Sequence, residues 1–308
     1  LDLHTNFRCD DSMMEFVADH LTNLHTLNIS FTSVTDKGLK SVSKLTKLLQ
    51  VDLAGLELND QNTQCLATLT RLKDLCLDNT RAGVESVRKL TSLTSLYMNF
   101  CKNVDDEVLN IVAQNIPNLK RLQLYGTDIT NDGVGYLQKI SGLKFLLLSG
   151  VHLTDNCVMY LNPHTQLQDL SIINAPQISG GCIAGSLECF KLKTINLEFT
   201  SCTDEALQAL TRFTDLEDIR IGGTQITDDG VKKIFGDNAA SFKKLQVLFL
   251  NSTKITDGSL DALLKNLPSL TTLDITHTKI SPEGATKVTE SLMHVHVSIP
   301  PGHIHQPA

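Results

Sequence analysis

The chain contains 308 residues, of which 41% are hydrophobic, 20% are charged and 5% are aromatic, and its net charge is −7. This composition excludes disordered, collagen-like and disulfide-rich miniprotein chains, and no apolar run approaches the roughly 18–20 residues of a membrane-spanning helix. The acidic balance, with 34 acidic residues against 27 basic ones, also argues against nucleic acid as a partner.

The pattern L-x-x-L-x-L recurs along the whole chain. Leu1 and Leu3 fit the last two positions of a first, partial copy, and the final copy ends at Val297, which makes thirteen copies with a mean spacing near 24 residues. The twelve full copies begin at Leu24, Leu48, Leu72, Leu93, Leu119, Leu143, Leu167, Leu192, Leu216, Leu245, Leu270 and Leu292. A regular period of this length is typical of stacked repeats. We therefore predict one repeat domain over residues 1–298 and an irregular tail, containing Pro and His, over residues 299–308.

Each copy predicts a strand followed by a short helix. Eight residues after the first Leu, most copies carry Thr, and Cys101 takes this position once. An aliphatic residue and a polar pair follow, as at residues 226–228, which is typical of a helix that begins with Thr as its N-cap and Asp in its first turn. Ser281 followed by Pro282 supports the same register, because Pro is tolerated at the first helical position.

Together these features resemble the leucine-rich repeat family over essentially the entire chain. The copies are similar to the cysteine-containing subtype, L-x-x-L-x-L-x-x-C-x-x-I-T-D-x-G-L, with I-T-D clear at residues 226–228 and 255–257 and Thr usually in place of Cys. The resemblance implies an α/β fold, namely a right-handed horseshoe-shaped solenoid of about 13 repeats. Its parallel β-sheet would line the concave side and its short helices the convex side.

Side chains between the Leu positions are predicted to face the concave side, because residues alternate along a strand. Tyr97, Tyr125, Phe145, Leu147 and Ile173 take such positions on four consecutive strands, over a width of about 15 Å. Clustered apolar side chains that face water are typical of a protein-binding hot spot. The alternative is that they pack on one another or on a missing segment, and the direction of the neighbouring Phe100 and Phe199 is not predicted.

The same face is predicted to be acidic. Asp74 and Asp78 lie on one strand beside the apolar positions, with Arg121 among those positions and Arg220 further along. Such a face favours a protein partner with a basic segment, because opposite charges steer the partner to the face and fix how it lies there. The predicted partner-binding residues are Tyr97, Arg121, Tyr125, Phe145, Leu147, Ile173, Asp74 and Asp78.

No motif for catalysis or cofactor binding is present in the sequence. Residues 180–186 are the nearest match to a phosphate-binding loop, but Ser186 stands where that loop needs Lys. His294 and His296 alternate on the last strand, near His277, and could hold a transition metal, although polar capping of an exposed final strand explains them without one. We therefore predict a protein that is not an enzyme and that has no cofactor and no metal site.

The eight cysteines form no C-x-x-C pair, so we expect free, mostly buried thiols and a reducing, cytoplasmic location. Cys76 is the exception, because its predicted position on the concave face makes it either a reactive thiol or a small interface side chain. Since the chain starts at Leu1 rather than Met, we expect missing N-terminal sequence, and secretion stays open.

The resulting hypothesis is a non-enzymatic protein-binding domain. Cysteine-class repeats most often form the substrate-recognition half of F-box ubiquitin-ligase receptors, so the resemblance implies that role. The alternative is a secreted or cell-surface recognition or adhesion protein of a microbe or protist.

Overall fold

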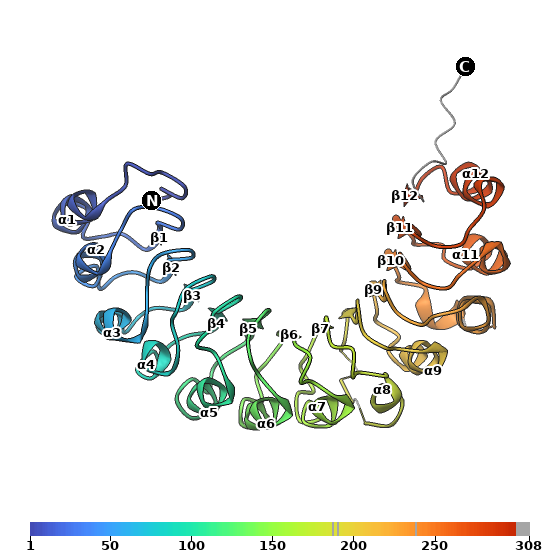
Figure 1. The fold of residues 1–308 in the computed structure, drawn as a ribbon, viewed down its shortest axis with the longest axis horizontal. Helices are drawn as coiled ribbons and strands as arrows, with labels where there is room; N and C mark the ends of the chain where they lie inside the picture. Colours follow the sequence, from blue (N-terminus) through green and yellow to red (C-terminus); the bar gives the residue numbers. More distant parts are fainter. Residues whose placement is uncertain (187, 190, 238, 300–308) are drawn as a thin grey trace, which may run out of the picture. The chain divides into compact units, whose positions relative to one another are not determined.

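The computed structural model describes residues 1–186, 188–189, 191–237 and 239–299 (Figure 1). Contacts divide the chain into two units, residues 1–152 and residues 153–308. The predicted extent of the repeat domain, residues 1–298, stays a prediction. Tail residues 300–308, with His303 and His305 among them, lie outside the described residues.

The first unit is a regular alternation of strands and short helices (Figure 1). Its strands are all parallel and pair in chain order. A bridge between Asp2 and Asn28 extends the pairing to the partial first copy. The strands are β1 (Thr26–Asn28), β2 (Gln50–Asp52), β3 (Asp74–Cys76), β4 (Ser95–Tyr97), β5 (Arg121–Leu124) and β6 (Phe145–Ser149). The helical segments are α1 (Asp11–His20), α2 (Asp36–Val42), α3 (Asp60–Thr63), η1 (Gln64–Thr68), α4 (Val84–Val87), α5 (Asp106–Asn115), α6 (Asn131–Tyr136) and η2 (Leu137–Lys139).

The second unit repeats this plan, again with parallel strands in chain order. Its strands are β7 (Asp169–Ile173), β8 (Thr194–Asn196), β9 (Asp218–Arg220), β10 (Val247–Phe249), β11 (Thr272–Asp274) and β12 (His296–Ser298). Its helical segments are α7 (Asp155–Met159), α8 (Gly181–Ser186), α9 (Asp204–Ala209), η3 (Leu210–Arg212), α10 (Asp228–Val231), η4 (Lys232–Asp237), η5 (Ala239–Phe242), η6 (Asp257–Ser259), α11 (Leu260–Lys265) and α12 (Pro282–Ser291). The two units together confirm the predicted α/β repeat architecture.

The core of each unit lies between its strands and its helices. The second residue of most strands is buried, as Leu96, Leu122 and Leu146 are, whereas the residues on either side of these three remain partly exposed. Aliphatic side chains therefore form a continuous layer from one copy to the next, as the scarcity of aromatic residues requires. The sheet face that points away from the helices is called the open face below.

A Thr that follows seven of the strands closes a turn. Thr80 is buried, and its hydroxyl donates a hydrogen bond of 2.7 Å to the backbone carbonyl of Leu77. The Sγ of Cys101, in the same position of the next copy, donates to that same carbonyl at 3.0 Å. Thr can therefore replace Cys in these copies because both groups satisfy a buried backbone carbonyl. The same Thr contact recurs at Thr32, Thr127, Thr200, Thr224, Thr253 and Thr278.

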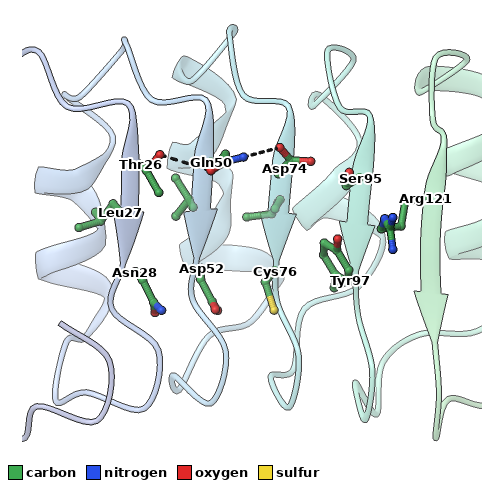
Figure 2. Close-up of a pocket in the computed structure, with 12 residues that line it drawn as sticks. Thr26, Leu27, Asn28, Gln50, Asp52, Asp74, Cys76, Ser95, Tyr97 and Arg121 are labelled. Carbon is green, nitrogen blue, oxygen red and sulfur yellow. Dashed lines mark hydrogen bonds between the residues drawn. The ribbon is translucent and has the colours of Figure 1, made fainter. Parts of the chain in front are cut away.

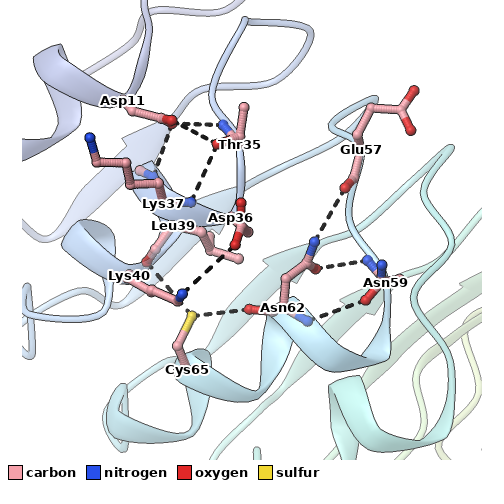
Figure 3. A network of polar contacts seen from close by, with 11 residues as sticks. Asp11, Thr35, Asp36, Lys37, Leu39, Lys40, Glu57, Asn59, Asn62 and Cys65 are labelled. Carbon is pink, nitrogen blue, oxygen red and sulfur yellow. Dashed lines mark hydrogen bonds and ion pairs between the residues drawn. The ribbon is translucent and has the colours of Figure 1, made fainter.

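The Asp at the start of a helix joins one copy to the next. The Asp11 carboxylate accepts hydrogen bonds from the backbone N–H and the hydroxyl of Thr35, at 2.8 Å and 2.6 Å, and from the N–H of Gly38 at 2.9 Å (Figure 3). Thr35 is the N-cap of the following helix, so the predicted cap position is confirmed. The predicted Asp, however, also serves the neighbouring copy. The same contact joins Asp106 to Thr130, Asp155 to Ser179, Asp204 to Thr227, Asp228 to Thr256 and Asp257 to Ser281.

Candidate protein-binding surface

The first and third residues of the strands form two rows across the open face of the first unit. Strand register places Asp74, Ser95, Arg121 and Phe145 side by side in the first row. It places Asp52, Cys76, Tyr97, Gln123 and Leu147 in the second. Asp78, Asn99 and Tyr125 lie two residues further along the chain, just beyond the ends of β3, β4 and β5. The seven predicted binding residues of this unit are all half-buried, and the eighth, Ile173, ends β7 in the second unit.

The aromatic side chains of this face form separate pairs rather than one continuous patch. The Arg121 guanidinium lies 4.3 Å from the centre of the Phe145 ring, a favourable cation–π arrangement. Tyr125 meets Phe100 edge-on, with 5.0 Å between ring centres. In the second row, Gln123 stands between Tyr97 and Leu147. Polar side chains thus divide the predicted cluster into distinct contact points.

Phe100 is a surface residue whose direction the sequence left open. Its backbone is left-handed, with φ of 57°, and its side chain is 54% exposed. Its ring lies over Gly126 of the next copy, where an added Cβ would come within 2.7 Å of the ring. Such a residue can be identified in the sequence: a Phe follows the strand in one copy, and Gly takes the same position in the next copy. Phe31 with Gly55 and Phe199 with Gly223 show the same arrangement.

Three carboxylates make the β2–β3 part of this face acidic. Asp74 accepts a hydrogen bond from the Gln50 amide at 3.1 Å, and Asp78 accepts two from Asn99, at 2.7 Å and 3.0 Å. Burial raises the pKa of the Asp78 carboxyl, and so does the nearby charge of Asp52, while the Asn99 hydrogen bonds oppose the rise. In the described part of the chain, no Lys, Arg or His forms an ion pair with these three carboxylates.

A hollow of about 480 Å³ opens between β1 and β5 on this face (Figure 2). One edge carries a hydrogen-bonded row from Thr26 through Gln50 to Asp74, with contacts of 3.3 Å and 3.1 Å. Tyr97 and Arg121 stand at the β4–β5 side (Figure 2). The hollow therefore offers both charged and aromatic contacts to a partner.

The open face of the second unit contains a different arginine environment. The Arg220 guanidinium lies 4.7 Å from the centre of the Phe249 ring and donates to both carboxylate oxygens of Asp218, with the shortest contact at 2.9 Å. Its charge is therefore matched within the chain, whereas the described residues offer Arg121 no ion pair.

Cys76 lies on the open face but is a poor nucleophile. Burial raises the pKa of its thiol, and the charges of Asp78 and Asp52 raise it further. Burial also raises the thiol pKa of Cys157 to about 12 and that of Cys202 to about 11. The described cysteines are all free thiols.

We expect slow thiol labelling of the folded chain at pH 8. Dithionitrobenzoate reacts with the thiolate, which the raised pKa values make scarce, so all eight thiols should react rapidly only after unfolding in guanidinium. The Cys76→Ser variant serves as the control and should leave the slow native rate unchanged. Fast stoichiometric labelling that this variant removes would show that Cys76 is reactive after all.

The described residues contain no group of three or more His, Cys, Asp or Glu side chains that could hold a metal ion. His296 begins β12 as an exposed residue, with His294 exposed before it. In the same part of the chain, no helix is long and apolar enough to cross a membrane.

Comparison with known proteins identifies the repeats. The family model described as "Leucine Rich repeat" matches residues 20–43, 214–235 and 266–288. The antagonist of mitotic exit network protein 1 of Saccharomyces cerevisiae is 28% identical over 193 residues, which cover 60% of this chain. The chain spans about a quarter of that relative's length, namely 26%.

Solved structures share the fold. An internalin of Listeria monocytogenes superposes with a TM-score of 0.67 at 21% identity, covering 93% of this chain and 82% of that one. A chain of the yeast Rad7–Elc1 complex superposes with a TM-score of 0.61 at 17% identity, covering 96% of this chain and 85% of that one. The chain therefore carries leucine-rich repeats and has the fold of a leucine-rich repeat protein.

Proposed function

We propose that this chain is a non-enzymatic domain that binds a protein partner through the open face of its first unit. The observation that carries the proposal is the mixed surface of β2–β6. Half-buried aromatic residues at β4–β6 lie beside carboxylates at β2–β3 that have no ion-pair partner among the described residues. Partly desolvated aromatic and arginine side chains are typical hot-spot residues. The partner is expected to present a basic segment to Asp74 and Asp78.

The specific role that we propose is substrate receptor of a ubiquitin ligase in the cytoplasm. The I-T-D pattern and its resemblance to cysteine-class repeats support this role. The fold likeness to a chain of the Rad7–Elc1 complex is consistent with a protein that works in an assembly. Buried free thiols in several separate copies suit a reducing compartment.

The second candidate is a secreted or cell-surface recognition protein, and the fold likeness to an internalin favours it. The coding sequence upstream of Leu1 distinguishes the two. An F-box or RING-like segment there would support the ligase role, whereas a signal peptide would rule it out.

The binding surface is tested by a double substitution, Tyr125→Ala with Phe145→Ala. We expect the purified variant to lose at least about tenfold in affinity for its partner, because two hot-spot side chains of about 1–2 kcal/mol each are removed. The measurement is quantitative capture of the partner, identified with the wild-type chain, followed by titration. A thermal melt must show that both chains are folded.

The matched control removes two aromatic side chains from the helices, Phe16→Ala in α1 and Tyr136→Ala in α6. This control should bind as the wild type does. Equal binding by the open-face variant and the wild type would reject the proposed surface.

A further inference from the structure

Two opposite charges line the hollow on the first unit, one on its middle strand and one at its β5 side. Asp74 on β3 and Arg121 on β5 belong to the same row, with Ser95 of β4 between them in register. Two strand steps of about 4.8 Å separate their backbones by about 9.6 Å. Figure 2 shows Asp74 and Arg121 on either side of Tyr97, all lining the hollow.

Neither of these charges is matched inside the described chain. Asp74 receives only a neutral amide hydrogen bond, from Gln50, and Arg121 rests on the neutral face of Phe145. Arg220 is different, because its guanidinium forms an ion pair with Asp218 at 2.9 Å on the open face of the second unit. A carboxylate and a guanidinium, neither of them in an ion pair among the described residues, thus line one hollow two strands apart.

Tyr97 lies within electrostatic reach of both groups. Burial raises the pKa of its phenol, the charge of Arg121 lowers it, and the charge of Asp74 raises it. Asp52 lines the hollow beside Asp74 and adds to the negative side. The hollow is therefore dipolar, and a partly desolvated aromatic ring lies between the two opposite charges.

We propose that this hollow binds an extended segment of the partner in which a Lys or Arg and an Asp or Glu lie two or three residues apart. The basic side chain meets Asp74, and the acidic side chain meets Arg121. This inference rests on the proposed protein-binding function and specifies the partner segment. A purely basic segment would leave a cation facing Arg121, and a nucleic-acid backbone would meet Asp52 and Asp74 with like charge.

The spacing follows from chain geometry. In a β-strand, residues two apart project on the same side and lie about 6.6 Å apart, and flexible Lys and Glu side chains cover the remaining distance. In a polyproline II segment, residues three apart project on the same side and lie about 9.3 Å apart, which matches the Asp74–Arg121 separation directly. Either conformation presents two opposite charges to Asp74 and Arg121.

The test is selection from a randomised 12-residue peptide library displayed on phage. The wild-type chain is expected to enrich peptides with opposite charges two or three residues apart and in one fixed order. The matched variant carries Asp74→Arg and Arg121→Asp together, which keeps the net charge and reverses the dipole. It is expected to enrich the opposite order, and circular dichroism must show that it is folded.

Single variants keep the test informative if the swapped chain does not fold. Replacing the acidic residue of an enriched peptide by Gln should weaken its binding to the wild-type chain about tenfold. The same replacement should weaken its binding to the Arg121→Gln variant less than twofold. Replacing the basic residue of the peptide should likewise weaken binding to the wild-type chain far more than binding to the Asp74→Asn variant. These couplings isolate each charge pair.

Three results would overturn the inference: no enriched peptide, enriched peptides without the paired charges, or an order that the swap leaves unchanged. Failure here is distinguishable from failure of the proposed function. If the natural partner still loses affinity in the Tyr125→Ala, Phe145→Ala variant, the open face binds protein and only the charge pairing is wrong.

Discussion

The Asp106→Ala variant is expected to lose about 2–3 kcal/mol of unfolding free energy. In the native chain, the Asp106 carboxylate accepts hydrogen bonds from the backbone N–H and the hydroxyl of Thr130, at 2.8 Å and 2.7 Å. Removing it leaves the part-buried donors of the next helix start without their charged acceptor. Urea denaturation followed by circular dichroism measures the change.

The matched control is Asp132→Ala, which removes an exposed Asp from the first turn of the next helix. Because no side-chain hydrogen bond to this carboxylate is formed among the described residues, only the helix-dipole contribution of about 0.3–1 kcal/mol is lost. Equal losses in the two variants would mean that the contact between copies contributes nothing specific.

The Gly133→Ala variant is expected to lose about 1–3 kcal/mol, although Ala is the better helix former. The added Cβ would lie 2.1 Å from the Asp106 Oδ1, and the two Thr130 hydrogen bonds, one to each carboxylate oxygen, hold that carboxylate in place. Gly142→Ala is the control, since its Cβ would meet nothing nearer than 3.7 Å. Both are measured by urea denaturation.

Combining the two substitutions gives the sharper result. In the Asp106→Ala background, the nearest obstacle to Gly133→Ala is gone, and the end of the Leu109 side chain, with its Cδ1 at 3.0 Å, remains close to the added Cβ. The substitution should therefore become nearly neutral or stabilise the chain by up to about 0.5–1 kcal/mol through helix propensity. An unchanged cost in that background would show that Gly133 is needed for another reason. The final G of the repeated I-T-D-x-G pattern is thus explained by the Asp of the preceding copy.

The repeat architecture could be predicted from the sequence because it depends on periodicity. Leucine positions recur with a nearly constant spacing, and each copy places them in the same buried row, as Leu96, Leu122 and Leu146 show. The helix starts were equally predictable, since Thr35 and Ser281 are N-caps and Pro282 is the first residue of its helix. These properties belong to single copies and need no knowledge of neighbours.

The site was predicted less completely because it depends on pairs of copies. Alternation places Tyr125 and Phe145 on the open face, but it does not show that Tyr125 meets Phe100 or that Arg121 rests on Phe145. The Asp contacts between copies were missed for the same reason. An Asp that only occupies the first turn of its helix and an Asp that also bonds to the next copy have the same local sequence. Whether the predicted residues bind a partner stays a prediction.

The pairing of Phe100 with Gly126 restricts how such a chain can change during evolution. A Phe in this corner requires Gly in the following copy, so the two positions must be inherited together. Duplicating the copy that carries Phe100 would place its ring against a second Phe, and deleting the copy that carries Gly55 would place the Phe31 ring against Asn79. Copies that carry Phe31, Phe100 or Phe199 are therefore expected to be duplicated together with their successors, which makes two adjacent copies, rather than one, the unit of duplication.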